Sequence, residues 1–133
     1  MQKRNECKFL KGVGVDLIRV RRIAQAYHRR PERFLHRIFS GQEIKLLFKK
    51  KNLLPSMAAR FAAKEAVAKA LGCGIGIARW REMEILPGER GKPTVCLSGG
   101  AKSWAEKCGI KGVEVSMSHD GPYAIAQAVA YGD

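Results

Sequence analysis

Residues 60–76 read RFAAKEAVAKALGCGIG, and this stretch determines most of what the sequence predicts. Its first part is rich in alanine and lacks proline and glycine, which favours a helix, and Gly72 predicts where that helix ends. Glu65 and Lys69 lie one helical turn apart, so their side chains project from the same face. The pair is compatible with an ordinary exposed ion pair. It is also compatible with a site where a carboxylate binds a metal ion and an ammonium group binds phosphate.

The residues around this pair favour a functional role. Small side chains occupy most other positions of the predicted helix, which is typical of a helix packed on several sides. These positions are Ala58, Ala59, Ala62, Ala63, Ala66, Ala68 and Ala70. A charged pair within such a segment suggests chemistry rather than a solvated surface.

Length and composition predict one globular domain. The chain has 133 residues, of which 46% are hydrophobic and 28% charged, enough for one core. We expect residues 1–10 to form a flexible N-terminal extension and residues 11–133 to form the single domain. The sequence contains no apolar run of the length that a signal peptide or membrane span requires, which predicts a cytoplasmic protein without a membrane partner. The four cysteines follow no metal-binding spacing and are expected to be free thiols.

The positive charge is concentrated in the first half of the chain. The formal net charge is +13, and residues 17–52 contain eleven lysines and arginines against two glutamates. This segment therefore predicts an electropositive face and an anionic partner. Nucleic acid, anionic lipid and an acidic protein all fit, so charge alone does not choose among them.

The first half of the chain predicts mainly helices. Residues 11–15 read as a short buried strand, followed by Asp16, which is placed to cap the N-terminus of a helix. Pro31 begins a second helical segment, and residues 40–43 (SGQE) form a capping-box signature for a third. Ser56 is predicted to cap the alanine-rich helix.

The second half changes to a period of two residues, which is typical of strands. Residues 80–86 and 94–97 predict a hairpin, residues 101–108 a helix, and residues 113–118 and 123–129 two strands joined by a turn. Helices mainly in the first half and an antiparallel sheet mainly in the second half predict an α+β fold.

Several motifs together resemble one family. They are Gly14-Val-Asp16, the segment 60–76, Gly91-Lys-Pro93 and Ser116-Met-Ser-His119, in this order. The chain resembles the small bacterial holo-acyl-carrier-protein synthases over residues 12–130. This resemblance implies the 4′-phosphopantetheinyl transferase fold and the transfer of the 4′-phosphopantetheine arm of coenzyme A to a serine of an apo acyl carrier protein, with release of adenosine 3′,5′-bisphosphate.

The resemblance also implies roles for individual residues. Asp16 and Glu65 match the acids that bind Mg²⁺, with Mn²⁺ as a possible replacement. Lys69 matches a catalytic lysine facing the phosphates of the coenzyme. Glu65, or a water molecule that it orders on the metal, is the candidate base for the carrier serine, and these two options remain open. The positions that match coenzyme-binding residues are Arg60, Lys64, Lys69, Gly72 and His119.

The resemblance further assigns the basic face to an acidic apo acyl carrier protein. Arg22, Arg29 and Arg33 match the docking positions of the family, although a solvated helix surface would look similar in sequence. The family commonly forms homotrimers, so we expect the same here.

The alternative is a basic RNA- or DNA-binding module without transferase activity. The basic segment contains few aromatic residues for base stacking, and Phe34 and Phe48 are predicted to lie in the core. A nucleic-acid partner is therefore disfavoured.

Overall fold

The computed structural model describes residues 9–133. The first strand begins at Leu10, so the predicted flexible extension lies almost entirely outside the described residues. Within them, the chain forms five α-helices, five strands and two short 3₁₀ segments. No helix among these residues is long and apolar enough to cross a membrane. In chain order the elements are β1 (Leu10–Arg19), α1 (Val20–Arg29), α2 (Pro31–Ile38), α3 (Gly41–Leu47), α4 (Leu53–Leu71), η1 (Trp80–Glu82), β2 (Met83–Pro87), η2 (Glu89–Gly91), β3 (Pro93–Leu97), α5 (Gly99–Lys107), β4 (Ile110–Asp120) and β5 (Tyr123–Gly132).

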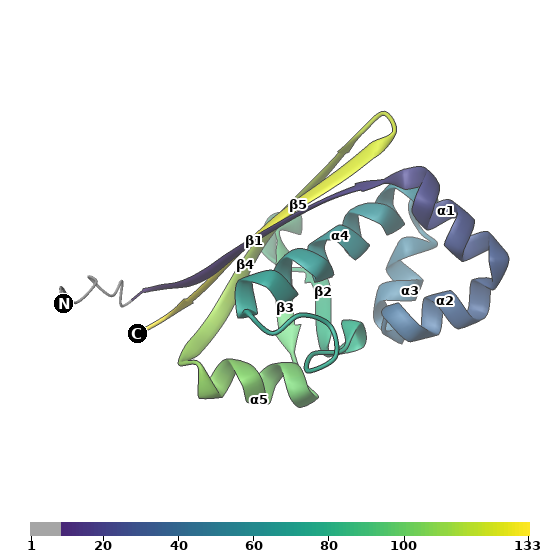
Figure 1. The fold of residues 1–133 in the computed structure, drawn as a ribbon. Helices are drawn as coiled ribbons and strands as arrows, with labels where there is room; N and C mark the ends of the chain where they lie inside the picture. Colours follow the sequence, from purple (N-terminus) through teal and green to yellow (C-terminus); the bar gives the residue numbers. More distant parts are fainter. Residues whose placement is uncertain (1–8) are drawn as a thin grey trace.

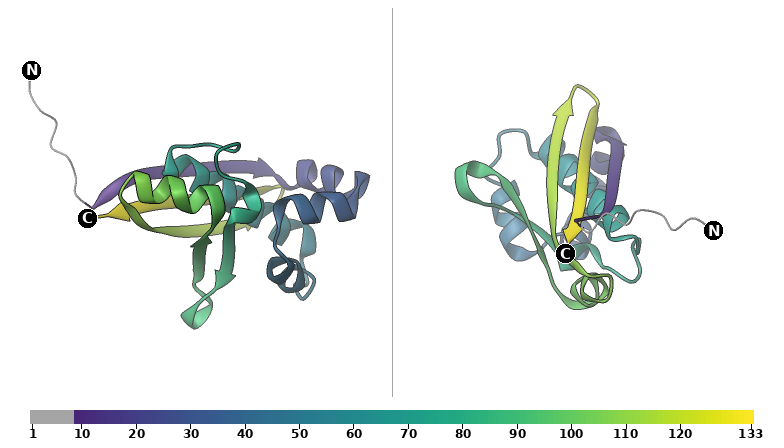
Figure 2. Two further views of the ribbon diagram at one scale, coloured as in Figure 1. Left: turned by 90° about the horizontal axis from the view of Figure 1, so that it is seen from below. Right: turned by 90° about the vertical axis from the view of Figure 1, so that its left-hand side faces the viewer.

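The strands form two antiparallel sheets. The larger sheet has the order β1-β5-β4, and β2 pairs with β3 in a separate hairpin. In Figure 1, α4 runs along the larger sheet, while α1, α2 and α3 gather at one end of the molecule and α5 lies at the other. The β2–β3 hairpin extends away from the larger sheet (Figure 2). The predicted α+β fold is therefore confirmed.

The core has two parts that meet at α4. The second half of α4 packs its alanines against small residues of β5, among them Ala126 and Ala128, which are fully buried or nearly so. The first half of α4 joins α1–α3 in a second cluster around Phe39, Leu47 and Met57. Because small side chains face each other in the first cluster, the helix and the sheet approach closely.

Several local predictions are confirmed. Ser40 and Glu43 form a complete capping box at the start of α3. Gly72 ends α4 with a left-handed φ of 79°, a conformation that glycine adopts without a steric penalty.

Four local predictions are wrong. The strand predicted over residues 11–15 runs from Leu10 to Arg19 and is not fully buried, because Val13 and Val15 are 60% and 55% exposed. Asp16 does not cap a helix, because β1 continues to Arg19 in register with β5 and places Asp16 opposite Ala126. Ser56 is not the N-cap of α4, which begins at Leu53, where an apolar side chain packs against the core and extends the helix. Phe48 is 53% exposed rather than buried.

Candidate active site

Two glycines allow β1 to lie directly on α4. A Cβ atom built on Gly14 would lie 2.0 Å from the carbonyl oxygen of Ala66, and one built on Gly12 would lie 2.0 Å from that of Ala70. Only glycine fits at such distances. Alternate strand residues share a face, so Asp16 projects toward α4 as these two glycines do.

The close approach brings Asp16 to Lys69. The Lys69 Nζ lies 3.5 Å from Oδ1 of Asp16 and donates a hydrogen bond of 2.8 Å to the carbonyl oxygen of Val15. The Asp16 side chain is 19% exposed and that of Lys69 54% exposed, so both can be reached from solvent.

Glu65 lies one turn before Lys69 on α4 and is half-buried. Its Oε1 accepts a hydrogen bond of 3.0 Å from Nε1 of Trp80, the first residue of η1. Two carboxylates and one lysine therefore come from β1 and one face of α4, the group that the family resemblance implies. Trp80 was not anticipated, because nothing in the local sequence pairs position 65 with position 80.

Two carboxylates are too few ligands to hold a metal ion by protein groups alone, but they suit a magnesium ion that takes its other ligands from water and substrate. Asp16 and Glu65 provide hard oxygen ligands, whereas no group of three or more His, Cys, Asp or Glu side chains within residues 9–133 could hold a metal. Mg²⁺ usually binds one or two carboxylates and completes its shell with water and substrate phosphate oxygens. The site therefore suits a magnesium ion that shares its ligands with a phosphorylated substrate.

Arg60 and His119 line a second region, a pocket of about 360 Å³. The Arg60 Nη1 donates a hydrogen bond of 2.8 Å to the carbonyl oxygen of Ile85, and burial lowers the pKa of this guanidinium, while Glu43 opposes the shift. His119 is exposed near the end of β4. Lys50 also lines the pocket, so several cationic groups face one cavity that could hold phosphate groups.

Comparisons with known proteins agree with this geometry. Residues 12–128 match the model of the 4′-phosphopantetheinyl transferase superfamily. The chain belongs to this superfamily. It is 43% identical to the holo-[acyl-carrier-protein] synthase of Natranaerobius thermophilus, over 92% of this chain and 98% of that protein. It is 46% identical to the enzyme of the same name from Caldanaerobacter subterraneus, over 90% and 94%.

Solved structures give the same result. The holo-[acyl-carrier-protein] synthase of Neisseria meningitidis superposes with a TM-score of 0.83 at 33% identity, covering 91% of this chain and 98% of the other. The Helicobacter pylori enzyme in complex with coenzyme A superposes with a TM-score of 0.79 at 34% identity, covering 89% and 98%. The chain is thus a phosphopantetheinyl transferase of the holo-[acyl-carrier-protein] synthase type, not a nucleic-acid-binding module without transferase activity.

Lys64 of the transferase has a structural position, contrary to prediction. Its side chain is fully buried, and its Nζ donates hydrogen bonds to Oε1 of Glu43 at 2.8 Å and to the carbonyl oxygens of Trp80 and Met83, each at 2.9 Å. Burial lowers the pKa of the Lys64 ammonium, and Glu43 opposes that shift. All three ammonium protons are used inside the protein, which contradicts a direct contact of Lys64 with coenzyme A.

The backbone N–H of Gly72 in the transferase is also hydrogen-bonded within the protein. It donates to the carbonyl oxygens of Ala68 and Lys69, at 3.1 and 3.0 Å, as a helix cap does. This N–H is therefore not available to a phosphate group in this conformation, and the position of Gly72 supports only the capping role.

The arginines predicted to dock a partner are all exposed. Arg22 and Arg29 lie on α1 and Arg33 on α2, and within residues 9–133 none of them forms a salt bridge.

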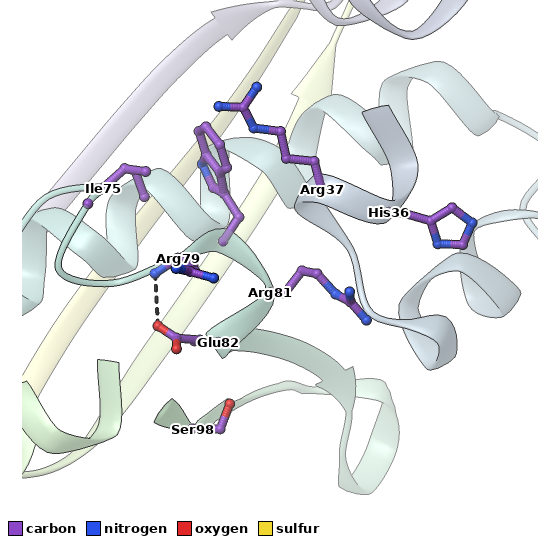
Figure 3. A pocket seen from close by; sticks show the side chains of 9 residues that line it. His36, Arg37, Ile75, Arg79, Arg81, Glu82 and Ser98 are labelled. Atoms are coloured by element: carbon purple, nitrogen blue, oxygen red, sulfur yellow. Dashed lines mark hydrogen bonds between the residues drawn. The ribbon is translucent and has the colours of Figure 1, made fainter. Parts of the chain in front are cut away.

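A further basic pocket of about 700 Å³ lies between α2 and η1 and was missed in the sequence. Among the residues that line it, shown in Figure 3, His36 and Arg37 come from α2, and Arg79 and Arg81 come from the segment around η1. An acid, Glu82, also lines the pocket. Its carboxylate accepts hydrogen bonds from the backbone N–H groups of Arg79, Gly100 and Ala101, which lower the pKa of Glu82. Glu82 therefore stays ionised, and the three arginines Arg37, Arg79 and Arg81 outnumber it, which leaves the pocket with an excess of positive charge.

Proposed function

We propose that this enzyme transfers 4′-phosphopantetheine from coenzyme A to a serine of an apo acyl carrier protein in a Mg²⁺-dependent reaction that releases adenosine 3′,5′-bisphosphate. The observation that carries this proposal is the position of Asp16 beside Lys69, on the face of α4 that also presents Glu65. The named activity of the relatives and the coenzyme A bound to the Helicobacter pylori enzyme support the same substrates.

Each residue of this group has a distinct role in the proposed reaction. Asp16 and Glu65 would hold Mg²⁺, or Mn²⁺ in its place, and the ion would neutralise charge on the pyrophosphate of the coenzyme. Glu65 is also placed to accept the proton of the carrier serine as its oxygen attacks the phosphorus next to pantetheine. Lys69 donates a hydrogen bond to the phosphate oxygen that leaves with the nucleotide, where negative charge develops.

The pocket around Arg60 and His119 is proposed to bind the nucleotide part of coenzyme A. A guanidinium and an imidazole, together with Lys50, supply donors for phosphate oxygens. On α4, Arg60 and Glu65 are five residues apart, a rotation of about 140° around the helix axis, so they project from different sides. A coenzyme bound to both groups would therefore have to reach around the helix or join two subunits.

We propose that two subunits share each site in a homotrimer. Support comes from the face of the larger sheet opposite α4, where several large apolar side chains are 40% exposed or more, namely Val13, Val15 and Leu17 of β1 and Tyr123, Ile125 and Tyr131 of β5. An exposed group of large apolar side chains such as this one is typical of a protein interface. Asp16 lies between Val15 and Leu17 in β1 but projects from the other side of the strand, toward α4. Because β1 is the edge strand of the β1-β5-β4 sheet, a second subunit that packs on the apolar face and extends past this edge would reach the carboxylate site.

The carrier protein is proposed to dock on α1 and α2. Arg22, Arg29 and Arg33 are exposed there and would meet an acidic protein. The basic pocket with Arg37 and Arg79 continues this positive surface toward Glu65, because Trp80 both lines the pocket and contacts Glu65. We place the reaction in the cytoplasm, and the three free cysteines among residues 9–133 fit a reducing compartment.

The experiment that tests the proposed function is the intact mass of several apo acyl carrier proteins after incubation with the enzyme, coenzyme A and Mg²⁺. We expect a gain of about 340 Da, one phosphopantetheine group, that disappears with EDTA and with Glu65→Ala. Glu106→Ala, an exposed acid on α5, is the matched control and should retain the gain. A carrier mass that never changes would contradict the proposal, and an undiminished gain with EDTA would contradict its metal requirement.

A further inference from the structure

The indole of Trp80 contacts the carboxylate that the proposed function assigns to the metal ion. Its Nε1 donates a hydrogen bond of 3.0 Å to Oε1 of Glu65. Within residues 9–133 the other oxygen, Oε2, has no hydrogen-bond partner, so one oxygen is restrained and one is available. We propose that Trp80 is a positioning residue that fixes the Glu65 carboxylate in the orientation that binds the cation.

Trp80 can hold another side chain only if it is itself immobile, and three contacts restrain it. Its carbonyl oxygen accepts a hydrogen bond of 2.9 Å from the buried Lys64. Its ring packs against that of Phe61, with 5.9 Å between centroids, and the guanidinium of Arg37 lies over the ring at 5.6 Å from its centroid. The backbone and the ring are therefore both fixed before any substrate binds.

The benefit of such a contact is preorganisation. A glutamate side chain on a helix surface samples several rotamers, and binding a cation would restrict it to one of them. A hydrogen bond that already selects the rotamer removes part of this cost. Groups that orient metal ligands in this way typically change metal affinity by about 10–100-fold when they are removed. This inference rests on the proposed function, because it assumes that Glu65 binds the metal.

The chain contains a matched control for the indole N–H. Trp104 on α5 donates a hydrogen bond of 2.7 Å to the carbonyl oxygen of Leu71 and packs against the core. Replacing either tryptophan with phenylalanine keeps an aromatic ring and removes one indole hydrogen bond. Only Trp80→Phe removes a bond to a carboxylate, so a difference between the two variants separates positioning from general loss of packing.

The first test measures binding of Mn²⁺ by the enzyme in the presence of coenzyme A and the absence of carrier protein, from the electron paramagnetic resonance signal of free Mn²⁺. We expect Trp80→Phe to weaken Mn²⁺ binding about 10-fold or more, and Trp104→Phe to leave it within twofold of wild type. In transfer assays, the Mg²⁺ concentration for half-maximal rate should rise in Trp80→Phe, while the KM for coenzyme A at saturating Mg²⁺ stays unchanged. Thermal unfolding of both variants reports any loss of stability separately.

A double-mutant cycle tests whether Trp80 acts through Glu65. In a Glu65→Gln background, Trp80→Phe should have little further effect on Mn²⁺ binding. Wild-type affinity in Trp80→Phe, tighter binding, or a full additional loss in the Glu65→Gln background would each overturn the inference. Failure of the proposed metal role looks different, because Glu65→Gln itself would then bind Mn²⁺ as wild type does.

Discussion

At the scale of single residues, the absence of a side chain at Gly14 matters as much as the chemistry of Asp16. The carboxylate reaches Lys69 only because β1 contacts the backbone of α4 at a distance that excludes a Cβ atom. A proposed metal ligand and a spacing residue thus lie two positions apart on the same strand face. The motif Gly14-Val-Asp16 encodes both functions.

We expect Gly14→Ala to destabilise the protein and to reduce transfer activity. The added methyl group would lie 2.0 Å from the carbonyl oxygen of Ala66 and 2.8 Å from Cβ of Lys69, so strand and helix must separate. Overpacking of this kind typically costs about 1–3 kcal/mol, measured here by urea unfolding at one protein concentration. Gly41→Ala is the matched control, since a Cβ there meets nothing within 4 Å. Equal stability of both variants would contradict the close approach.

Spacing along the chain paired Glu65 with Lys69, whereas Asp16 joined them only through the family resemblance, because its local sequence favoured a helix cap. The sequence did not predict the position of Lys64. Its partner Glu43 lies 21 residues earlier and was recognised only as part of a capping box, a local motif. Whether a lysine faces a ligand or the core depends on these distant contacts.

At the scale of elements, the buried pair of Glu43 and Lys64 connects four segments. Glu43 starts α3 and its Oε2 accepts a hydrogen bond of 3.0 Å from the N–H of Ile85 in β2. Lys64 lies in α4, and its hydrogen bond to the carbonyl oxygen of Trp80 connects this helix and Glu43 to η1. Residues of α3, α4 and β2 line the pocket of Arg60, and η1 lines the basic pocket, so the pair supports the shape of both.

Breaking this pair should be costly. Lys64→Met leaves the Glu43 carboxylate fully buried without its counter-ion, a change that typically costs about 3–5 kcal/mol. Adding Glu43→Gln should restore part of the loss, because the neutral amide removes the unpaired charge. Lys102→Met, at an exposed site on α5, should change the free energy of unfolding by less than about 0.5 kcal/mol. A similarly small effect of Lys64→Met in urea unfolding would be inconsistent with the proposed structural role.

Glu82 joins two elements and should make stability depend on pH. Backbone N–H groups, that of Arg79 foremost, lower the pKa of Glu82 below its ordinary value of 4.5. A lowered pKa means that the ionised side chain stabilises the fold above the unfolded-state pKa and that this contribution disappears as pH falls through the folded-state pKa. Glu82→Gln should therefore be less stable than wild type at pH 7.

The difference in unfolding free energy between Glu82→Gln and wild type should shrink steadily below about pH 4.5. Glu89→Gln replaces an exposed acid on η2 whose side chain has no hydrogen bond or ion pair in the described part of the chain. This control should match wild type throughout. A constant gap between Glu82→Gln and wild type from pH 7 to pH 3 would show that the charge of Glu82 does not contribute.

Elements with local signals were predicted more accurately than those that depend on distant contacts. The capping box located α3, and Gly72 located the end of α4. The start of α4 was misplaced because packing of Leu53 extends the helix beyond the more obvious cap at Ser56. The end of β1 was misplaced because pairing with β5, more than one hundred residues away in the chain, overrides the capping preference of Asp16.

At the scale of the whole molecule, charge and apolar surface lie on different parts of the protein. The exposed arginines of α1 and α2 lie at one end, whereas large exposed apolar side chains gather on β1 and β5, on the sheet face opposite α4. With the docking and assembly proposed above, an acidic carrier and further copies of the chain would bind to separate surfaces.

Reversing one charge on the docking surface should affect the carrier selectively. Arg22→Glu removes a positive group from α1 and adds a negative one, so an acidic partner is repelled. We expect the KM for apo carrier protein to rise about 10-fold at low salt and the KM for coenzyme A to change less than twofold. Lys107→Glu, at the end of α5, is the control for net charge. Equal increases in both KM values would argue against docking on α1.

The apolar sheet face leads to a prediction about assembly. Light scattering should give about three times the chain mass of 14.7 kDa for the wild-type enzyme. Ile125→Lys places a charge beside Leu17 among the exposed apolar side chains and should yield monomers, whereas Phe48→Lys, at an even more exposed apolar site beyond α3, should not. A wild-type monomer, or a trimer that tolerates Ile125→Lys, would contradict the assignment of this face.

Subunit mixing distinguishes a shared site from one within a single chain. Asp16→Ala disables the carboxylate group and Arg60→Ala the nucleotide pocket, so each variant should be nearly inactive alone. If each site joins the carboxylates of one subunit to the pocket of another, mixed trimers contain some interfaces with both halves intact. Random assembly from equal amounts makes about one interface in four complete, so co-refolding should restore about a quarter of wild-type activity. If both halves belong to one chain, no mixture can restore activity, because every subunit then carries a defect.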